Sequence, residues 1–286
     1  MRHAKREGGG RNSLVFPLRD MLHLLPSFAI YCICYIAPYC WSFLSSFGDN
    51  SCLSGFVGLE NYGVLFRDSY YLLSLQNTLL FLFASITTTL TIAVILAHLL
   101  YSFRVFRPVI VVLLIPFFLP APSITVIWRV MMGNASGIAE FLNLKDADWK
   151  FISLLFLFVW KNVGASVALL LSGLCAVDPD IFSAGHLDGA SRRVQLYRIE
   201  IPLLKHVIMF VLLYLFMNGV RIYRECYMLY GGYPPASVYF VPHYINNYFA
   251  RLDYSLLCCA ATVFSNLILA VFCGIWILLR KEEDEL

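Results

Sequence analysis

Long runs of apolar residues, separated by short polar segments, fill most of this chain of 286 residues. A helix needs about 20 apolar residues to cross the hydrocarbon of a bilayer. The runs predict six transmembrane helices, of which the fifth is long enough only if Arg221 lies at the far interface. The six runs are Met21–Phe47, Tyr70–Phe103, Pro108–Trp128, Phe151–Val177, Pro202–Val220 and Tyr254–Leu279.

The prolines most central to the third run are Pro116 and Pro120. A proline within a helix removes a backbone N–H and clashes with the preceding turn. We therefore expect the third helix to bend, and its freed backbone groups to be satisfied by neighbouring helices or by cavity water.

Composition agrees with a membrane protein. Hydrophobic residues make up 60% of the chain and charged residues 14%, whereas a soluble domain carries about 25% charge. Too few polar groups remain to cover a water-facing surface, so most of the chain must face lipid or other apolar protein. The net charge is only +3, so the overall charge gives no information on nucleic-acid binding, and we expect no nucleic-acid partner.

Nine cysteines lie mostly within the apolar runs. Such cysteines usually serve as small buried hydrophobic residues. They have no His or carboxylate at ligand spacing, so we expect no metal site. A disulfide between Cys52 and Cys226 outside the membrane is an open alternative.

The distribution of Lys and Arg predicts the orientation. With the N-terminus inside, cytoplasmic segments hold thirteen of these residues and outer loops hold four, as the positive-inside rule requires. Both termini are then cytoplasmic. The chain divides into an N-terminal arm (1–20), a first transmembrane helix (21–47), an extracytoplasmic loop (48–69), a core of five transmembrane helices (70–280) and a cytoplasmic tail (281–286).

The longest polar segment, residues 178–205, is cytoplasmic in this orientation and carries its own start and stop signals. Asp178 can cap a helix whose first residue is a proline. Asp188-Gly189 marks a turn, and Ser191 can cap a second short helix that Pro202 breaks. Small and apolar groups share one side of the first helix: Ile181, Ala184 and Leu187, with Gly185 between them.

This segment carries a resemblance. The pattern Ser183-Ala184-Gly185-x-x-Asp188-Gly189-Ala190, followed by Ile201-Pro202-Leu203-Leu204, resembles the cytoplasmic coupling loop of binding-protein-dependent ABC importer permeases. The family begins this loop with Glu-Ala-Ala, so Ser183 replaces the Glu and Gly185 the second Ala. Any salt bridge made through that Glu is lost, whereas the turn and the helix exit are kept.

A second element resembles one branch of that family. Phe56-x-Gly58-Leu59-x-Asn61-Tyr62, followed by Asn77-Thr78, is similar to the carbohydrate-uptake branch related to the larger permease of the maltose system. The resemblance covers residues 56–279. It implies an all-α integral membrane protein with six transmembrane helices, the type-1 ABC importer permease fold, and cytoplasmic coupling helices.

The resemblance also implies partners and a location. The partners are a homologous second permease subunit, an ABC ATPase dimer that binds ATP and Mg, and an extracytoplasmic sugar-binding protein, in the lipid of a bacterial cell membrane. The chain has no Gly-x-x-x-x-Gly-Lys-Ser/Thr phosphate loop, so we expect no enzyme activity and no cofactor in it. The coupling residues would be Ser183, Ala184, Gly185, Asp188, Gly189, Ala190 and Pro202.

Polar residues inside the apolar runs are candidates for a solute path, because such groups usually face the bundle interior or water. Lys161 is either a pore-facing cation or a packing or snorkelling lysine. Asn218 either meets solute or bonds between helices. Trp160 either stacks on a sugar ring or joins an aromatic belt, the default for the other tryptophans. The candidates are Asn77, Trp160, Lys161, Asn162, Asn218 and Arg221, and Arg224-Glu225 is interpreted as a surface or interface pair.

Two other classes of protein stay open. A secondary transporter or channel for a polar solute would act without an ATPase. A multispan membrane enzyme would need a catalytic constellation, and the chain has neither a His-Glu-x-x-His nor a Gly-x-Ser-x-Gly motif. The sequence does not distinguish mono-, di- or oligosaccharides from a polyol phosphate.

Overall fold

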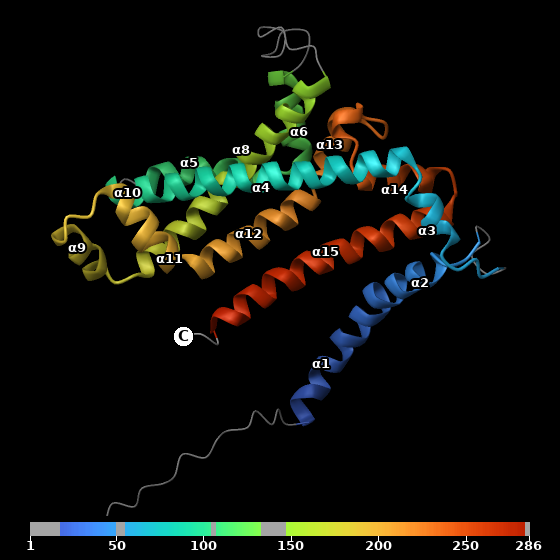
Figure 1. Ribbon diagram of the computed structural model, residues 1–286, viewed down its shortest axis with the longest axis horizontal. Helices are drawn as coiled ribbons and strands as arrows, with labels where there is room; N and C mark the ends of the chain where they lie inside the picture. Colours follow the sequence, from blue (N-terminus) through green and yellow to red (C-terminus); the bar gives the residue numbers. More distant parts are fainter. Residues whose placement is uncertain (1–17, 50–54, 104–106, 133–146, 284–286) are drawn as a thin grey trace, which may run out of the picture.

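A computed structural model describes residues 18–49, 55–103, 107–132 and 147–283 (Figure 1). The regular elements in these ranges are helices, and one isolated β-bridge pairs Gly48 with Phe56. In chain order they are α1 (Leu18–Tyr31), η1 (Cys32–Ile36), α2 (Ala37–Ser45), α3 (Glu60–Leu65), α4 (Ser69–Phe103), α5 (Arg107–Phe118), α6 (Ala121–Met132), α8 (Ala147–Ala176), α9 (Pro179–Leu187), α10 (Arg192–Gln195), η2 (Leu196–Glu200), α11 (Ile201–Leu203), α12 (Lys205–Val220), α13 (Tyr223–Tyr230), η3 (Ala236–Val238), α14 (Val241–Ala250) and α15 (Tyr254–Glu283).

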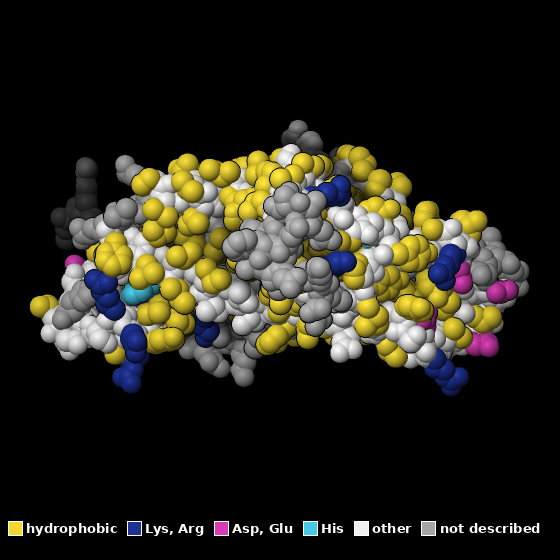
Figure 2. All heavy atoms as spheres, turned by 90° about the horizontal axis from the view of Figure 1, so that it is seen from above, with side chains coloured by type: hydrophobic (Ala, Val, Ile, Leu, Met, Phe, Trp, Pro, Cys, Tyr) yellow, Lys and Arg dark blue, Asp and Glu magenta, His cyan; other side chains and the backbone are white. Residues whose placement is uncertain are grey.

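Five stretches of the described residues are long and apolar enough to cross a membrane, and a bent pair, α5 and α6, makes a sixth if it counts as one span. The expectation of an all-α protein with several membrane spans is therefore confirmed. Apolar side chains cover much of the face seen in Figure 2, and most of its acidic side chains gather toward the end that holds α3.

The third span is broken, as its prolines predicted. α5 ends at Phe118 and α6 begins at Ala121, with an angle of 100° between them. Pro116 lies inside α5, whereas Pro120 lies at the break itself. The residue before a proline disfavours helical backbone, which explains why the helix ends just before Leu119. We call this break the elbow.

The fifth span is longer than the apolar run predicted. A short turn at Arg221 and Ile222 separates α12 from α13, and the two together form a 26-residue candidate span, Lys205–Tyr230. Arg221 therefore lies within this candidate span and not at its end. Asn218, Arg224 and Glu225, which the sequence placed at the outer end of the fifth span, also fall within these 26 residues.

Two π-helical turns each precede a proline. η1 ends one residue before Ala37-Pro38, and η2 ends just before Ile201-Pro202. In each case the next N–H bonds to the carbonyl five residues back, from Ala37 to Cys32 and from Ile201 to Leu196. The wider turn makes room for a residue that lacks an N–H. The prediction that Pro202 breaks its helix is therefore wrong, because the backbone stays helical to Leu203 and turns at Leu204.

The main core lies around α8, which packs against α4, α5 and α12. Leu154, Leu157, Leu170 and Val167 of α8 are fully buried. Gly164 of α8 allows α5 to approach so closely that a Cβ there would overlap the Leu113 carbonyl. A smaller core, which includes Leu65, Tyr71, Val241, Tyr244 and Phe264, joins α3, α4, α14 and α15.

The element Phe56–Tyr62 closes the connection between α2 and α3. The Asn61 side chain donates to the carbonyls of Ser46 (3.1 Å) and Gly48 (2.8 Å). The Tyr62 hydroxyl lies 2.6 Å from the Ser46 hydroxyl. The Asn and Tyr of the branch-specific pattern therefore fix the end of the first span.

Three of the described cysteines, Cys226, Cys258 and Cys259, are buried, and four others face outward on the isolated chain. The expectation that the cysteines are buried within the chain is therefore wrong for most of those described, because these cysteines lie on outward-facing sides of their apolar helices. Cys52 lies outside the described residues, as do most of the N-terminal arm and the end of the tail. Among the described residues no cluster of His, Cys, Asp and Glu could hold a metal ion.

Candidate functional site

The segment 178–205 folds through the predicted caps. The Asp178 carboxylate accepts from the Asp180 N–H (3.0 Å), and the Ser191 hydroxyl accepts from the Val194 N–H (3.4 Å). Between the helices, Gly189 has φ +75°, which an L side chain rarely adopts. The capped helices and the glycine turn predicted from the sequence are confirmed.

Three contacts bind this segment to the last turns of α4. The ring of Phe182 lies 5.2 Å from that of Tyr101, and the Arg192 guanidinium lies 4.9 Å from the Phe103 ring. Third, His98 Nδ1 lies 2.8 Å from Glu200 Oε2. The side chains of His98 and Glu200 are both buried, with exposed fractions of 8% and 1%. Sequence reasoning missed this pair, because His98 and Glu200 are 102 residues apart.

α9 is anchored along one side and bare along the other. Phe182 is buried, and a Cβ at Gly185 would come within 2.7 Å of Ile199 Cδ1. Ile181 and Leu187 are 42% and 89% exposed, and Ala184 is also exposed. The Ser183 hydroxyl donates to the Pro179 carbonyl within the same helix (3.1 Å). The Asp188 side chain is exposed, and backbone bonds close the turn before Ala190.

The elbow lines a polar cavity of about 410 Å³, which we call the elbow cavity. It brings together three of the solute-path candidates, Lys161, Asn162 and Asn218, from α8 and α12. Arg129 of α6 donates to the Met228 carbonyl (2.6 Å) and ties the elbow to α13. The lining residues are Phe117, Leu119, Pro120, Ala121, Pro122, Lys161, Asn162, Asn218, Arg224 and Met228.

A buried ion pair stands at the edge of this cavity. Lys161 bonds to Glu225, whose side chain is only 2% exposed, whereas Arg224 is exposed. The interpretation of Arg224-Glu225 as one pair is therefore wrong. Adjacent helical residues point in different directions, so the partner of Glu225 comes from the facing helix α8.

The asparagines of the cavity are held by defined bonds. Asn162 donates to the Phe158 carbonyl (2.9 Å) and accepts from the Tyr214 hydroxyl of α12 (3.3 Å). Asn218 donates to the Tyr214 carbonyl four residues back (2.9 Å). The interhelical bond considered for Asn218 is thus made by Asn162 instead.

The other candidates lie outside the elbow cavity. Asn77 donates to the carbonyls of Ala236 (2.6 Å) and Tyr239 (3.1 Å), so it joins α4 to the loop before α14. Arg221 is exposed beside the turn between α12 and α13. Trp160 stacks on Trp128 at 6.0 Å. Trp128 is 2% exposed, so a belt position is wrong for that residue.

No protein-family model matches the chain. The trehalose/maltose transport system permease MalF of Thermococcus litoralis is 28% identical over 215 residues, covering 70% of this chain and 72% of that protein. The sulfoquinovosyl glycerol permease SmoG of Agrobacterium fabrum is 25% identical over 246 residues, covering 80% and 79%.

A solved structure gives the same result for the fold. A subunit of a bacterial ABC transporter that imports the acidic polysaccharide alginate superposes with a TM-score of 0.78 at 16% identity, covering 92% of this chain and 96% of that one. The resemblance to ABC importer permeases is confirmed.

A further relative of this chain is the sn-glycerol-3-phosphate transport system permease protein UgpA of Salmonella typhimurium, 27% identical over 69% of this chain and 72% of that one. These relatives are transport proteins, which agrees with the expectation that this chain is not an enzyme. The apolar helices of this chain and its similarity to membrane transport permeases support a multi-pass location in a membrane.

Proposed function

We propose that this permease forms half of the translocation pathway of an ATP-driven carbohydrate importer in a bacterial cell membrane. A homologous permease supplies the other half, an ABC ATPase dimer binds ATP and Mg, and an extracytoplasmic protein delivers the sugar. The observation that carries the proposal is α9, which is anchored to α4 by Phe182 and bare along Ile181, Ala184 and Leu187. Such a bare apolar side fits a groove on a partner.

Coupling follows from how the segment is fastened. The contacts from Phe182, Arg192 and Glu200 all reach the last turns of α4. When the ATPase dimer closes on α9, the displacement passes directly to α4 and from there to the bundle. We propose that the elbow cavity then alternates between the two sides of the membrane and holds the sugar through Lys161, Asn162 and Asn218.

The proposed orientation places residues 178–205 and both termini in the cytoplasm. The C-terminal end of α15 and the helices α9 to α11 lie toward the same end of the molecule (Figure 1), which supports this arrangement. Ser191→Cys, in a variant without the exposed cysteines, is expected to react with an impermeant maleimide only in inside-out vesicles. Reaction in right-side-out vesicles alone would exclude contact with an ATPase.

The main test uses the complex. Affinity-tagged permease is purified from its native host, reconstituted in liposomes and assayed for sugar uptake with ATP inside. Co-purification of an ATPase and ATP-dependent uptake are expected. Uptake by the chain alone, driven by an ion gradient, would instead support the secondary-transporter alternative and contradict the proposal.

A further inference from the structure

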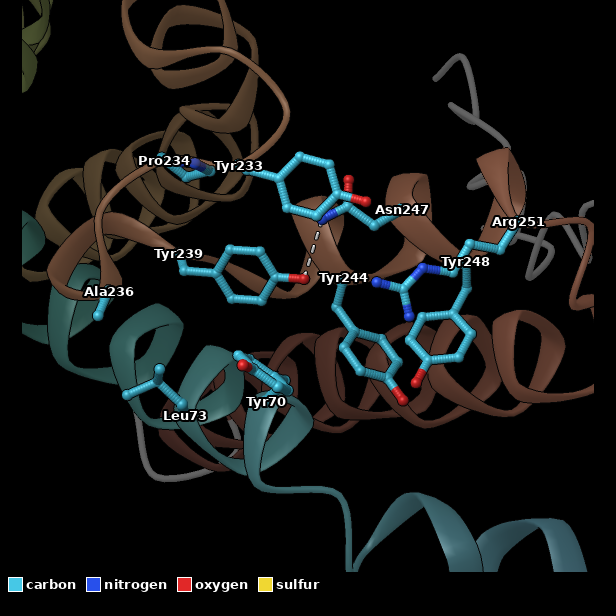
Figure 3. Close-up of a pocket in the computed structure, with 10 residues that line it drawn as sticks. All are labelled: Tyr70, Leu73, Tyr233, Pro234, Ala236, Tyr239, Tyr244, Asn247, Tyr248 and Arg251. Carbon is cyan, nitrogen blue, oxygen red and sulfur yellow. Dashed lines mark hydrogen bonds between the residues drawn. The ribbon is translucent and has the colours of Figure 1, made fainter.

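A second cavity, shown in close-up in Figure 3, is lined by α14 and the start of α4, at the other end of the bundle from α9 (Figure 1). Its volume is about 290 Å³, and it is enclosed by the start of α4, the loop before α14, and α14 itself. Five tyrosines line it, and we call it the tyrosine cavity: Tyr70, Tyr233, Tyr239, Tyr244 and Tyr248. It shares no lining residue with the elbow cavity.

We propose that the tyrosine cavity binds one ring of a saccharide on the extracytoplasmic side, before the sugar reaches the elbow cavity. This proposal rests on the proposed transport of carbohydrate and on the orientation given with it. It adds a separate binding site, at the mouth of the pathway.

The wall of the cavity is fixed by hydrogen bonds before any ligand arrives. The Tyr244 and Tyr248 hydroxyls both donate to Asp68 Oδ2, at 2.8 and 3.0 Å. Asp68 Oδ1 accepts from the Tyr70 N–H at 2.8 Å. One carboxylate therefore joins α14 to the start of α4. A wall that is already ordered loses little conformational entropy when a ligand binds.

The floor offers both donors and acceptors. The Asn247 amide donates to the Tyr239 hydroxyl at 3.2 Å, and both residues are nearly buried. In that bond the hydroxyl accepts, so its own proton can serve a ligand, and the amide has a second N–H and a carbonyl oxygen. An apolar side chain from a protein partner would cover these polar groups without bonding to them, which is costly. A sugar can donate and accept through each hydroxyl.

The mouth offers aromatic faces and a cation. The rings of Tyr70 and Tyr233 are 68% and 69% exposed, and in Figure 3 the ring of Tyr239 lies between them. The Arg251 guanidinium lies over the Tyr248 ring at 5.4 Å. An aromatic ring packs well on the C–H face of a sugar, and its hydroxyl and a guanidinium bond to the polar edge.

Size limits the ligand. Ligand pockets commonly have volumes of about 300–1,000 Å³, and this cavity lies at the lower end of that range. It therefore suits a single ring, with the rest of a longer sugar extending past Tyr233 to the outside.

The experiment measures sugar binding to the full chain in lipid nanodiscs, with no ATPase and no binding protein. The probes are maltose, trehalose and glucuronate, detected by saturation-transfer NMR. We expect one or more to bind. Tyr233→Ala should weaken that binding about tenfold through loss of a stacking face, and Tyr233→Phe should restore it to within about twofold because it keeps the face.

Two further variants separate the sites. Phe249→Ala removes an aromatic of α14 that is 58% exposed and does not line the cavity, and it should leave nanodisc binding unchanged. Asn218→Ala alters the elbow cavity, so any binding lost in that variant belongs to the elbow cavity and not to the tyrosine cavity. The proposal is overturned if no probe binds, if Phe249→Ala weakens binding as much as Tyr233→Ala does, or if only Asn218→Ala weakens it. It is also overturned if Tyr233→Ala affects only affinity for the sugar-binding protein.

The outcome is distinguishable from failure of the proposed function. Nanodisc binding that depends on Tyr233 supports the tyrosine cavity even if the reconstituted complex shows no ATP-dependent uptake. Conversely, if no probe binds the native chain in nanodiscs while the reconstituted complex transports normally, the importer is supported and the tyrosine cavity is overturned.

Discussion

Replacement of Gly164 by alanine tests how closely the elbow is packed. Gly164 is buried in α8, opposite α5. An alanine Cβ there would overlap the Leu113 carbonyl and lie 3.0 Å from the Leu114 nitrogen. The obstructing atoms belong to the backbone, so no side chain can turn away. Because carbon atoms pack best about 3.5–4.0 Å from their neighbours, α5 would have to withdraw by more than about 1 Å.

We expect Gly164→Ala to lower the free energy of unfolding by about 1–3 kcal/mol, as overpacked cores do. The intrinsic helix preference of alanine, about 1 kcal/mol, acts in the opposite direction. The measurement is equilibrium unfolding of the purified permease in mixed detergent micelles. Transport should also fall, because Lys161 and Asn162 line the elbow cavity one turn or less from the replaced residue.

Other glycines of the permease provide matched controls. Gly274 of α15 has no atom within 4 Å of an added Cβ, so Gly274→Ala should be neutral or slightly stabilising. Gly173 and Gly219 would meet only side-chain ends of Leu204, Val207 and Leu82, at 2.6 Å or more, so their alanine variants should fall between the two. If Gly164→Ala is as stable as Gly274→Ala, α5 does not lie against α8 as described.

Three further predictions follow from single contacts. Lys161→Met should cost about 3–5 kcal/mol, because it leaves the buried Glu225 carboxylate unpaired. Glu225→Gln should cost less, because the amide oxygen can still accept from Lys161, which is 18% exposed, and the double variant should cost less than the sum of the two in a double-mutant cycle of unfolding free energies. Gly189→Asp should change stability by only about 1–2 kcal/mol, since the turn is exposed and only φ +75° is strained, but should abolish stimulation of ATP hydrolysis by substrate in the reconstituted complex; normal stimulation would contradict the coupling role. Burial lowers the pKa of His243, in α14, to about 4 from 6.5, so the unfolded chain binds the proton more readily than the folded chain does. The stabilisation is therefore fully present above pH 6.5, and up to about 3 kcal/mol of it is lost as the pH falls to 4. His243→Gln should flatten that part of the curve of unfolding free energy against pH relative to the native protein.

Much of the fold was predictable from local signals. Runs of apolar residues located the spans, and Pro120 located the elbow, because both effects depend on neighbouring residues alone. The caps at Asp178 and Ser191 were predictable for the same reason. Pro202 misled because a π-turn upstream can absorb a missing N–H, and no local signal in the sequence reveals that turn.

The candidate sites were predictable only in part. Lys161, Asn162 and Asn218 were singled out as polar residues within apolar runs, but their partners were not. Glu225 pairs with a lysine 64 residues away, and such a pairing depends on how whole helices pack. The roles of these residues in transport and coupling remain predictions.

The length of α4 has a mechanical consequence. Its 35 residues form one uninterrupted helix, about 50 Å long at 1.5 Å per residue. Near one end of α4, His98 contacts Glu200, and at the other end the Tyr70 N–H donates to Asp68. If a rigid rod of that length tilts by about 5° about one end, its other end moves by about 4 Å. In the proposed orientation, a small displacement imposed at the Glu200 end of α4 would therefore be transmitted to the other end of the helix.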